Sequence, residues 1–151
     1  MKDEFGDRMK LYYEARSKTS LMRRTPVIIR LDGKAFHTFT KGFVKPFDEC
    51  MSKAMQETMK YLCENIQGCV LGYTQSDEIT LVLIDYQKLT TDAWFDYEVQ
   101  KICSVAASMA TFIFNRQFQV QVNELSWKGE LGDENLAKSY IRAIKSGAVF
   151  D

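Results

Sequence analysis

The chain has 151 residues, the length of one domain, which is enough to bury a hydrophobic core. Lysine plus arginine and aspartate plus glutamate number 20 each, so the net charge indicates no polyanionic partner, although a local basic patch could still bind nucleic acid. The four cysteines lack C-x-x-C spacing and there is a single histidine, which argues against a structural zinc site. No apolar run approaches the roughly 18 residues of a membrane span, and no signal-peptide pattern is present, so we expect a cytoplasmic protein with no membrane partner.

The N-terminal third predicts a short helix and then a strand that ends in an acid. Residues 3–16 carry an apolar stripe at helical spacing. Pro26 favours extended backbone before it, and the β-favouring residues after it predict a buried strand from Val27 to Asp32. Residues 33–45 then form a loop that is rich in aromatic and basic side chains.

The middle of the chain predicts a helix followed by two strands. Apolar residues recur every three or four positions from Pro46 to about Gly68, which predicts one helix with Pro46 in its first turn and Phe47 on its apolar face. Residues 70–73 and 79–84 predict two strands joined by a tight connection. Because both faces of the second strand are largely apolar, we expect it to lie in the centre of a sheet.

The last third is mainly helical. A long apolar helix is predicted over residues 93–115, whereas residues 117–122 fit either a short strand or a continuation of that helix. Asp133 can cap a final helix that Gly147 ends. Residues 148–151 resemble the opening of another strand.

This order of elements indicates an α+β fold. Its core is a split β-α-β-β-α-(β) arrangement, an antiparallel sheet with helices on one face and the last strand apparently truncated. In that layout the first and third strands lie side by side. Asp32, at the end of one, and Asp77, at the start of the other, should therefore meet.

Two carboxylates at neighbouring strand ends suit Mg²⁺, which binds few protein oxygens and leaves room for water and phosphate. Two such ions would activate an attacking hydroxyl and stabilise a leaving phosphate. The Gly33 carbonyl is a natural further ligand, and the backbone amides of residues 34–36 could meet phosphate oxygens. The alternative is that Asp32 simply ends a strand while Asp77 and Glu78 belong to a hairpin. Strand alternation turns Glu78 away from Asp77, so we interpret Glu78 as structural.

Three motifs, in register, resemble the signatures of the tRNA(His) guanylyltransferase family, in particular its bacterial and archaeal guanylyltransferase-like branch. They are Arg30-Leu31-Asp32-Gly33-Lys34-Ala35-Phe36-His37, Lys45-Pro46-Phe47-Asp48-Glu49 and Gln75-Ser76-Asp77-Glu78. The resemblance covers residues 30–115, and Phe150-Asp151 matches the start of the family's next strand.

The resemblance implies a polymerase-like palm that adds nucleotides to the 5′ end of tRNA, in the 3′-to-5′ direction, with two Mg²⁺ ions and with GTP or another nucleoside triphosphate and ATP as substrates. The residues that it implicates as catalytic are Asp32 and Asp77, and the metal ligands that it implies are Asp32, the Gly33 carbonyl and Asp77. Those that it implicates in nucleotide binding are Gly33, Lys34, Ala35, Phe36, His37, Lys45, Asp48, Ser76 and Lys101. Among these, His37 and Asp48 would contact the incoming base and Lys101 a second nucleotide.

The chain also departs from the family pattern. Phe47 replaces a more usual Asn, and Tyr97 and Glu98 stand where eukaryotic members place arginines. These departures argue against strict guanylyltransferase specificity and fit better with tRNA repair by template pairing.

The family continues beyond a position equivalent to Asp151, so the 151 residues are expected to be one palm-like catalytic domain, either a fragment or an abridged member. By resemblance a homo-oligomer, a tetramer, is expected. Two other functions stay open, namely another palm-type enzyme such as a nucleotide cyclase, and a non-catalytic nucleotide- or RNA-binding module.

Overall fold

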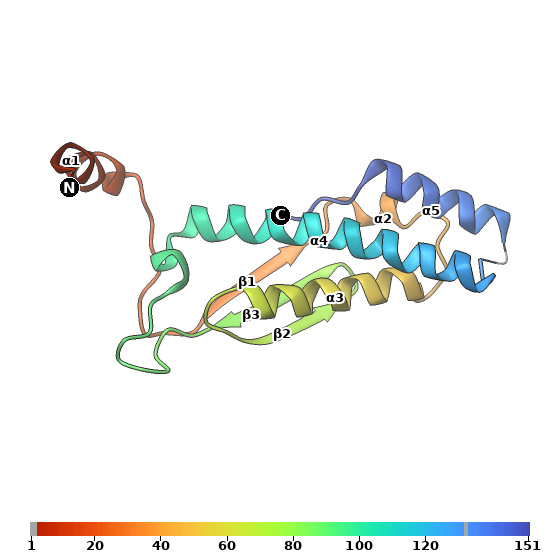
Figure 1. The fold of residues 1–151 in the computed structure, drawn as a ribbon, viewed down its shortest axis with the longest axis horizontal. Coiled ribbons are helices and arrows are strands. Elements are labelled where there is room, and N and C mark those ends of the chain that lie inside the picture. Colours follow the sequence, from red (N-terminus) through yellow and green to blue (C-terminus); the bar gives the residue numbers. More distant parts are fainter. Residues whose placement is uncertain (1–2, 132) are drawn as a thin grey trace.

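The computed structural model describes residues 3–131 and 133–151, and its core is a three-stranded antiparallel sheet packed against two long helices (Figure 1). The elements in chain order are α1 (Glu4–Tyr12), η1 (Glu14–Arg16), β1 (Val27–Asp32), α2 (Phe36–Phe39), α3 (Glu49–Asn65), β2 (Cys69–Gln75), β3 (Glu78–Leu83), η2 (Trp94–Tyr97), α4 (Val99–Lys128) and α5 (Glu134–Ser146). The expected mixture of helices with a small antiparallel sheet is confirmed. No helix in the described ranges is both long and apolar enough to cross a bilayer.

The strands are ordered β1-β3-β2, so β3 is central, as predicted. It pairs antiparallel with both neighbours, and its first residue, Glu78, lies opposite Asp32 on one side and Gln75 on the other. Burial alternates along β1 and β3, because the side chains of every second residue pack against the helices. The opposite face of the sheet carries exposed side chains such as Ile28 and Tyr73. The C-terminal end of β1 and the turn between β2 and β3 therefore lie at the same end of the sheet.

Helix α3 begins later than predicted. Asp48 is its N-cap, and the Asp48 carboxylate accepts a hydrogen bond from the Met51 amide at 3.0 Å. A capped helix start explains the shift, since the side chain supplies the acceptor that the first amides lack. Pro46 lies before the helix, in a cis peptide bond with Lys45, and Phe47 is 82% exposed instead of buried. The predictions for these two residues were wrong.

Helix α4 differs from the prediction at both ends. It starts at Val99 because residues 95–97 have positive φ angles, which break a right-handed helix. It then continues through residues 117–122 to Lys128, since Phe118 and Val122 extend its buried stripe. The ambiguous segment is therefore helix.

Helix α5 and the segment after it follow the prediction. Asp133 caps α5, and Gly147, with φ of 68°, ends it. Residues 149–151 then pair antiparallel with the outer edge of β1. The amide and carbonyl of Asp32 form hydrogen bonds of 3.0 and 3.1 Å with Asp151.

The N-terminal helix α1 projects away from the rest of the chain (Figure 1) and buries none of its residues. It is shorter than the 3–16 helix predicted from sequence, because residues 14–16 form the short η1 turn.

Candidate active site

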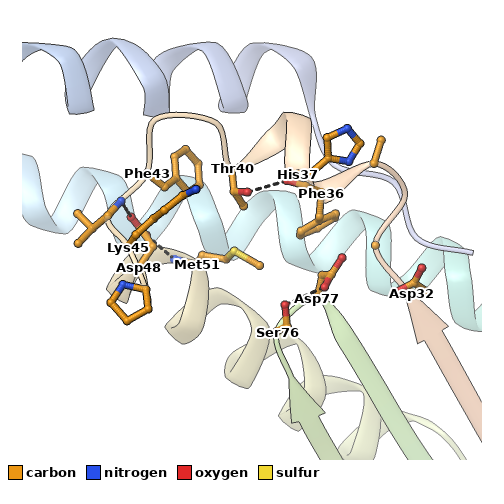
Figure 2. Close-up of a pocket in the computed structure, with 14 residues that line it drawn as sticks. Asp32, Phe36, His37, Thr40, Phe43, Lys45, Asp48, Met51, Ser76 and Asp77 are labelled. Atoms are coloured by element: carbon orange, nitrogen blue, oxygen red, sulfur yellow. Dashed lines mark hydrogen bonds between the residues drawn. The ribbon is translucent and has the colours of Figure 1, made fainter.

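A hollow of about 740 Å³ opens where β1 ends beside the β2–β3 turn (Figure 2). Its lining residues come from the end of β1, from α2 and the loop after it, from the start of α3 and from the β2–β3 turn. They are Asp32, Gly33, Ala35, Phe36, His37, Thr40, Phe43, Val44, Lys45, Pro46, Asp48, Met51, Ser76 and Asp77. Segments more than 40 positions apart in the sequence thus share one cavity.

Asp32 and Asp77 both line this hollow, as predicted. Asp32 is the last residue of β1 and lies on its exposed side. Asp77 does not belong to β3 but to the two-residue turn before it. The Gly33 amide donates a hydrogen bond of 3.1 Å to the Asp77 carbonyl and so connects the two turns directly.

The turn that carries Asp77 needs an unusual backbone conformation. Ser76 has φ of 56°, a left-handed value that tight hairpin turns require at their first central position. The Ser76 hydroxyl donates a hydrogen bond of 2.9 Å to Oδ1 of Asp77. The carboxylate is thereby oriented by its neighbour while its second oxygen can still serve as a ligand.

The donor set fits a hard divalent cation such as Mg²⁺. In the described ranges, the Asp32 carboxylate takes part in none of the hydrogen bonds or ion pairs within the protein, so both its oxygens can coordinate. No group of three or more His, Cys, Asp or Glu side chains that could hold a metal occurs among the described residues. Two carboxylates and the Gly33 carbonyl would leave several coordination positions for water or phosphate, which is the arrangement Mg²⁺ prefers.

The sheet register adds a third acid that the sequence interpretation set apart. Glu78 lies directly across from Asp32, although it does not line the hollow. It forms an ion pair with Arg30, whose pKa is raised by that hydrogen bond and by the nearby acidic charge. Glu78 therefore balances the charge of Arg30 close to Asp32 and Asp77.

The backbone after Asp32 supplies fewer phosphate donors than predicted. The Lys34 amide is already used, since it donates to the Val149 carbonyl at 2.8 Å. Ala35, with φ of 54°, is the N-cap of α2, and the first amides of a helix have no acceptor within it. The Ala35 and Phe36 amides therefore remain the backbone candidates.

The Phe36 side chain belongs to the core. It is 4% exposed, and its ring contacts those of Phe39, Phe114 and Phe150 with centroid distances of 5.1 to 5.4 Å. A Cβ on Gly33 would lie 2.3 Å from the Phe36 ring. The tight approach of this ring thus requires glycine at position 33, and it fixes the turn that follows Asp32.

His37 and Lys45 are exposed and line the hollow from α2 and from the loop before α3. Lys34 and Lys45 belong to none of the ion pairs formed within residues 3–131 and 133–151. Lys45 can therefore meet an anionic ligand in the hollow without breaking an existing ion pair, whereas Lys34 does not line the hollow.

Asp48 is held by the protein itself. Its carboxylate accepts hydrogen bonds from the Val44 and Met51 amides at 3.1 and 3.0 Å and from the Tyr140 hydroxyl at 2.8 Å. Burial, and then the hydrogen bond to Asp48, raise the pKa of Tyr140. The sequence did not indicate the Tyr140 contact, because nothing local connects two positions 92 residues apart.

Lys101 does not line the hollow. It lies in the first turn of α4, and its Nζ is 5.4 Å from the centre of the Phe95 ring. Tyr97, at one of the positions where eukaryotic members place arginine, is 1% exposed, and Glu98 forms an ion pair with Lys18 at 3.5 Å. A role for Lys101 toward a second nucleotide stays a prediction.

A family model described as tRNAHis guanylyltransferase matches residues 6–150. A solved bacterial tRNA(His) guanylyltransferase-like protein in complex with GTP is 44% identical, with a TM-score of 0.72 over 99% of this chain and 56% of that chain. Its structure in complex with ATP aligns with a TM-score of 0.75 over 97% of this chain and 55% of the other. The tRNA(His) guanylyltransferase of Schizosaccharomyces pombe is 31% identical over 110 residues, which are 70% of this chain and 41% of the relative. The chain thus spans about half the length of the proteins that it matches.

Proposed function

Because this chain belongs to the tRNAHis guanylyltransferase family, we propose that it is a Mg²⁺-dependent nucleotidyltransferase that adds nucleotides to the 5′ end of tRNA in the 3′-to-5′ direction. The observation that carries the proposal is that Asp32 and Asp77 line one hollow on turns joined by the Gly33–Asp77 hydrogen bond. Support also comes from the related bacterial protein, which was solved with GTP and with ATP.

In this proposal Asp32, Asp77 and the Gly33 carbonyl hold two magnesium ions. When bound, the ions would supply activation of the 3′-hydroxyl of the incoming nucleotide and charge stabilisation at the leaving phosphate. The protein's own part is to present the two carboxylates at a fixed separation. Ser76 supports this by donating to Asp77 Oδ1 at 2.9 Å.

The nucleoside triphosphate would occupy the rest of the hollow. Lys45 and the backbone amides of Ala35 and Phe36 would face its phosphates, because a lysine and backbone amides both attract anions. His37 contacts the base. The carboxylate of Asp48 already accepts three hydrogen bonds, so its chief part would be to hold the loop that carries Lys45 in place against the phosphates.

The observed strand order supports a polymerase palm. With residues 149–151 beside β1, the order of strands across the sheet follows that of a split β-α-β-β-α-β unit. We propose this topology for the catalytic domain.

We also propose that the protein forms a homo-oligomer, which the family resemblance suggests is a tetramer. Analytical ultracentrifugation tests the oligomer, and a monomer at micromolar concentration contradicts it.

The departures at Phe47, Tyr97 and Glu98 favour repair of truncated tRNA over strict guanylylation. In the decisive experiment, tRNA lacking its first nucleotide, labelled at its 3′ end, carries a 5′-monophosphate or a 5′-triphosphate. It is incubated with the four nucleoside triphosphates and Mg²⁺, and intact tRNA(His) is incubated under the same conditions in a parallel reaction. Extension of the truncated tRNA at its 5′ end, lost on chelation, is the expected result.

The same experiment separates the other functions. Turnover of triphosphate without RNA extension indicates a cyclase-type enzyme. Nucleotide binding that survives chelation and is unchanged in Asp77→Ala, with no turnover, indicates a binding module. Either result contradicts the proposal.

A further inference from the structure

Two polar side chains on α4 form hydrogen bonds with residues 148–150. This segment pairs in turn with the backbone around Gly33, beside the proposed metal ligands. Asn115 makes two hydrogen bonds to the backbone of Ala148. Its Oδ1 accepts from the Ala148 amide at 2.7 Å, and its Nδ2 donates to the Ala148 carbonyl at 2.8 Å. The Thr111 hydroxyl, one helical turn earlier, accepts from the Phe150 amide at 3.0 Å.

These side-chain contacts satisfy backbone groups of residues 148–150 that a neighbouring β-strand would otherwise satisfy. A strand edge with unpaired amides and carbonyls needs acceptors and donors, and here side chains of a helix supply them. The opposite edge of the same segment pairs with the backbone of Asp32 and Lys34 through Asp151 and Val149. Residues 148–151 are thus held between α4 on one side and the turn after β1 on the other.

A short series of hydrogen bonds connects α4 with the hollow. The first bonds come from the side chains of Asn115 and Thr111, and the later ones join backbone groups only. Asn115 and Thr111 fix residues 148–150, and this segment fixes Asp32 and Lys34. Gly33, between them, holds the Asp77 carbonyl. The segment therefore contacts the backbone on both sides of Gly33 and supports the position of the Asp32 carboxylate.

We propose that Asn115 and Thr111 are positioning residues for the divalent-cation site. They set the position of the Asp32–Gly33 backbone through residues 148–151 and touch neither the cation nor the nucleotide. This inference rests on the proposed function, since it requires that Asp32 and Asp77 bind the cation.

The test is Mn²⁺ binding to the 151-residue chain, measured by the loss of the free-ion electron paramagnetic resonance signal. Thr111→Val keeps the shape of the side chain but removes the acceptor, and Thr111→Ser restores it. Asn115→Ala removes both contacts with Ala148. Because partners that orient metal ligands typically change affinity by about 10- to 100-fold, we expect the Mn²⁺ dissociation constant to rise about tenfold in Thr111→Val and Asn115→Ala. Thr111→Ser should bind as the wild type does.

A second measurement excludes general damage. Metal-free GTP binding and the urea midpoint are compared for the same variants, and Thr111→Val should change the affinity for Mn²⁺ far more than that for GTP. Equal Mn²⁺ affinity in folded Thr111→Val, Thr111→Ser and wild type overturns the inference, as does an equal loss of GTP and Mn²⁺ binding. Asp32→Asn is the separate control for the proposed function. If it binds Mn²⁺ as tightly as the wild type, the cation site itself is wrong.

Discussion

The Gly33 amide and the Asp77 carbonyl are joined by a hydrogen bond of 3.1 Å, so the two turns that carry the candidate metal ligands are linked through their backbones. The link does not depend on either carboxylate. Replacing an Asp side chain by Asn should therefore remove charge from the site and leave the turns in place. This makes the roles of Asp32 and Asp77 testable without unfolding the site.

Gly33→Ala should destabilise the protein and abolish activity, because the new Cβ would lie 2.3 Å from the Phe36 ring. Overpacking of this kind costs about 1–3 kcal/mol of unfolding free energy. Urea denaturation measures the loss. The double variant Gly33→Ala/Phe36→Leu should recover part of the penalty of Gly33→Ala, and a strictly additive double variant would contradict the packing explanation.

Tyr140→Phe should loosen the loop that carries Lys45. It removes the buried 2.8 Å hydrogen bond to the Asp48 carboxylate, which is worth about 1.5–3 kcal/mol for a charged acceptor. We expect lower stability together with weaker nucleotide binding, measured by urea denaturation and calorimetry. Tyr73→Phe removes a hydroxyl from a residue that is 56% exposed and should change stability by less than about 0.5 kcal/mol.

The fold was largely predictable from local patterns, whereas several contacts of the site were not. Apolar periodicity was enough to predict β1 and the body of α3, whereas the meeting of Asp32 with Asp77 was predicted from the split β-α-β-β order of the elements. The start of α3 was predicted wrongly because proline is common in a first helical turn and Asp48 is an equally good cap. Local pattern could not choose between them.

Contacts between distant segments left no signal in the sequence. The pairing of Tyr140 with Asp48, and of Asn115 with Ala148, depends on how α5 and α4 pack. The left-handed turn at residues 95–97 is equally invisible, because none of these residues is glycine and ordinary residues avoid positive φ. Helix periodicity therefore placed the start of α4 too early.

Acid should weaken the other end of the sheet through Asp85. Burial alone raises the pKa of Asp85, but hydrogen bonds from the Arg23 guanidinium and the Arg24 amide outweigh it, so the pKa lies below its ordinary value. The stabilisation by this carboxylate is complete above the ordinary pKa of about 4 and is lost as the pH falls through the lower, folded-state pKa.

Asp85→Asn should consequently be less stable than the wild type at pH 7, and the difference should shrink as the pH approaches 2. Urea denaturation across this range measures it. Asp92→Asn, at an acid that is 87% exposed, is the matched control and should change little. A difference in unfolding free energy between Asp85→Asn and the wild type that stays constant down to pH 2 would argue against the ion pair with Arg23.

The cysteines should differ sharply in reactivity. Burial, and then the negative charge of Asp48, raise the pKa of Cys50 to about 11, whereas Cys103 is exposed. Since the thiolate is the reactive form, a disulfide reagent at pH 8 should modify Cys103 first and Cys50 only on unfolding. Mass spectrometry of the native protein identifies the site, and Cys103→Ser should remove the fast phase.

The most direct test of the account compares the rate of 5′ extension of truncated tRNA by wild type, Asp32→Asn and Asp77→Asn, with Asp92→Asn as the control and urea midpoints to verify folding. We expect both site variants to lose at least about a hundredfold in rate while staying folded, and Asp92→Asn to match the wild type. Extension at the wild-type rate by either Asp32→Asn or Asp77→Asn would contradict the claim that these two carboxylates together hold the catalytic magnesium.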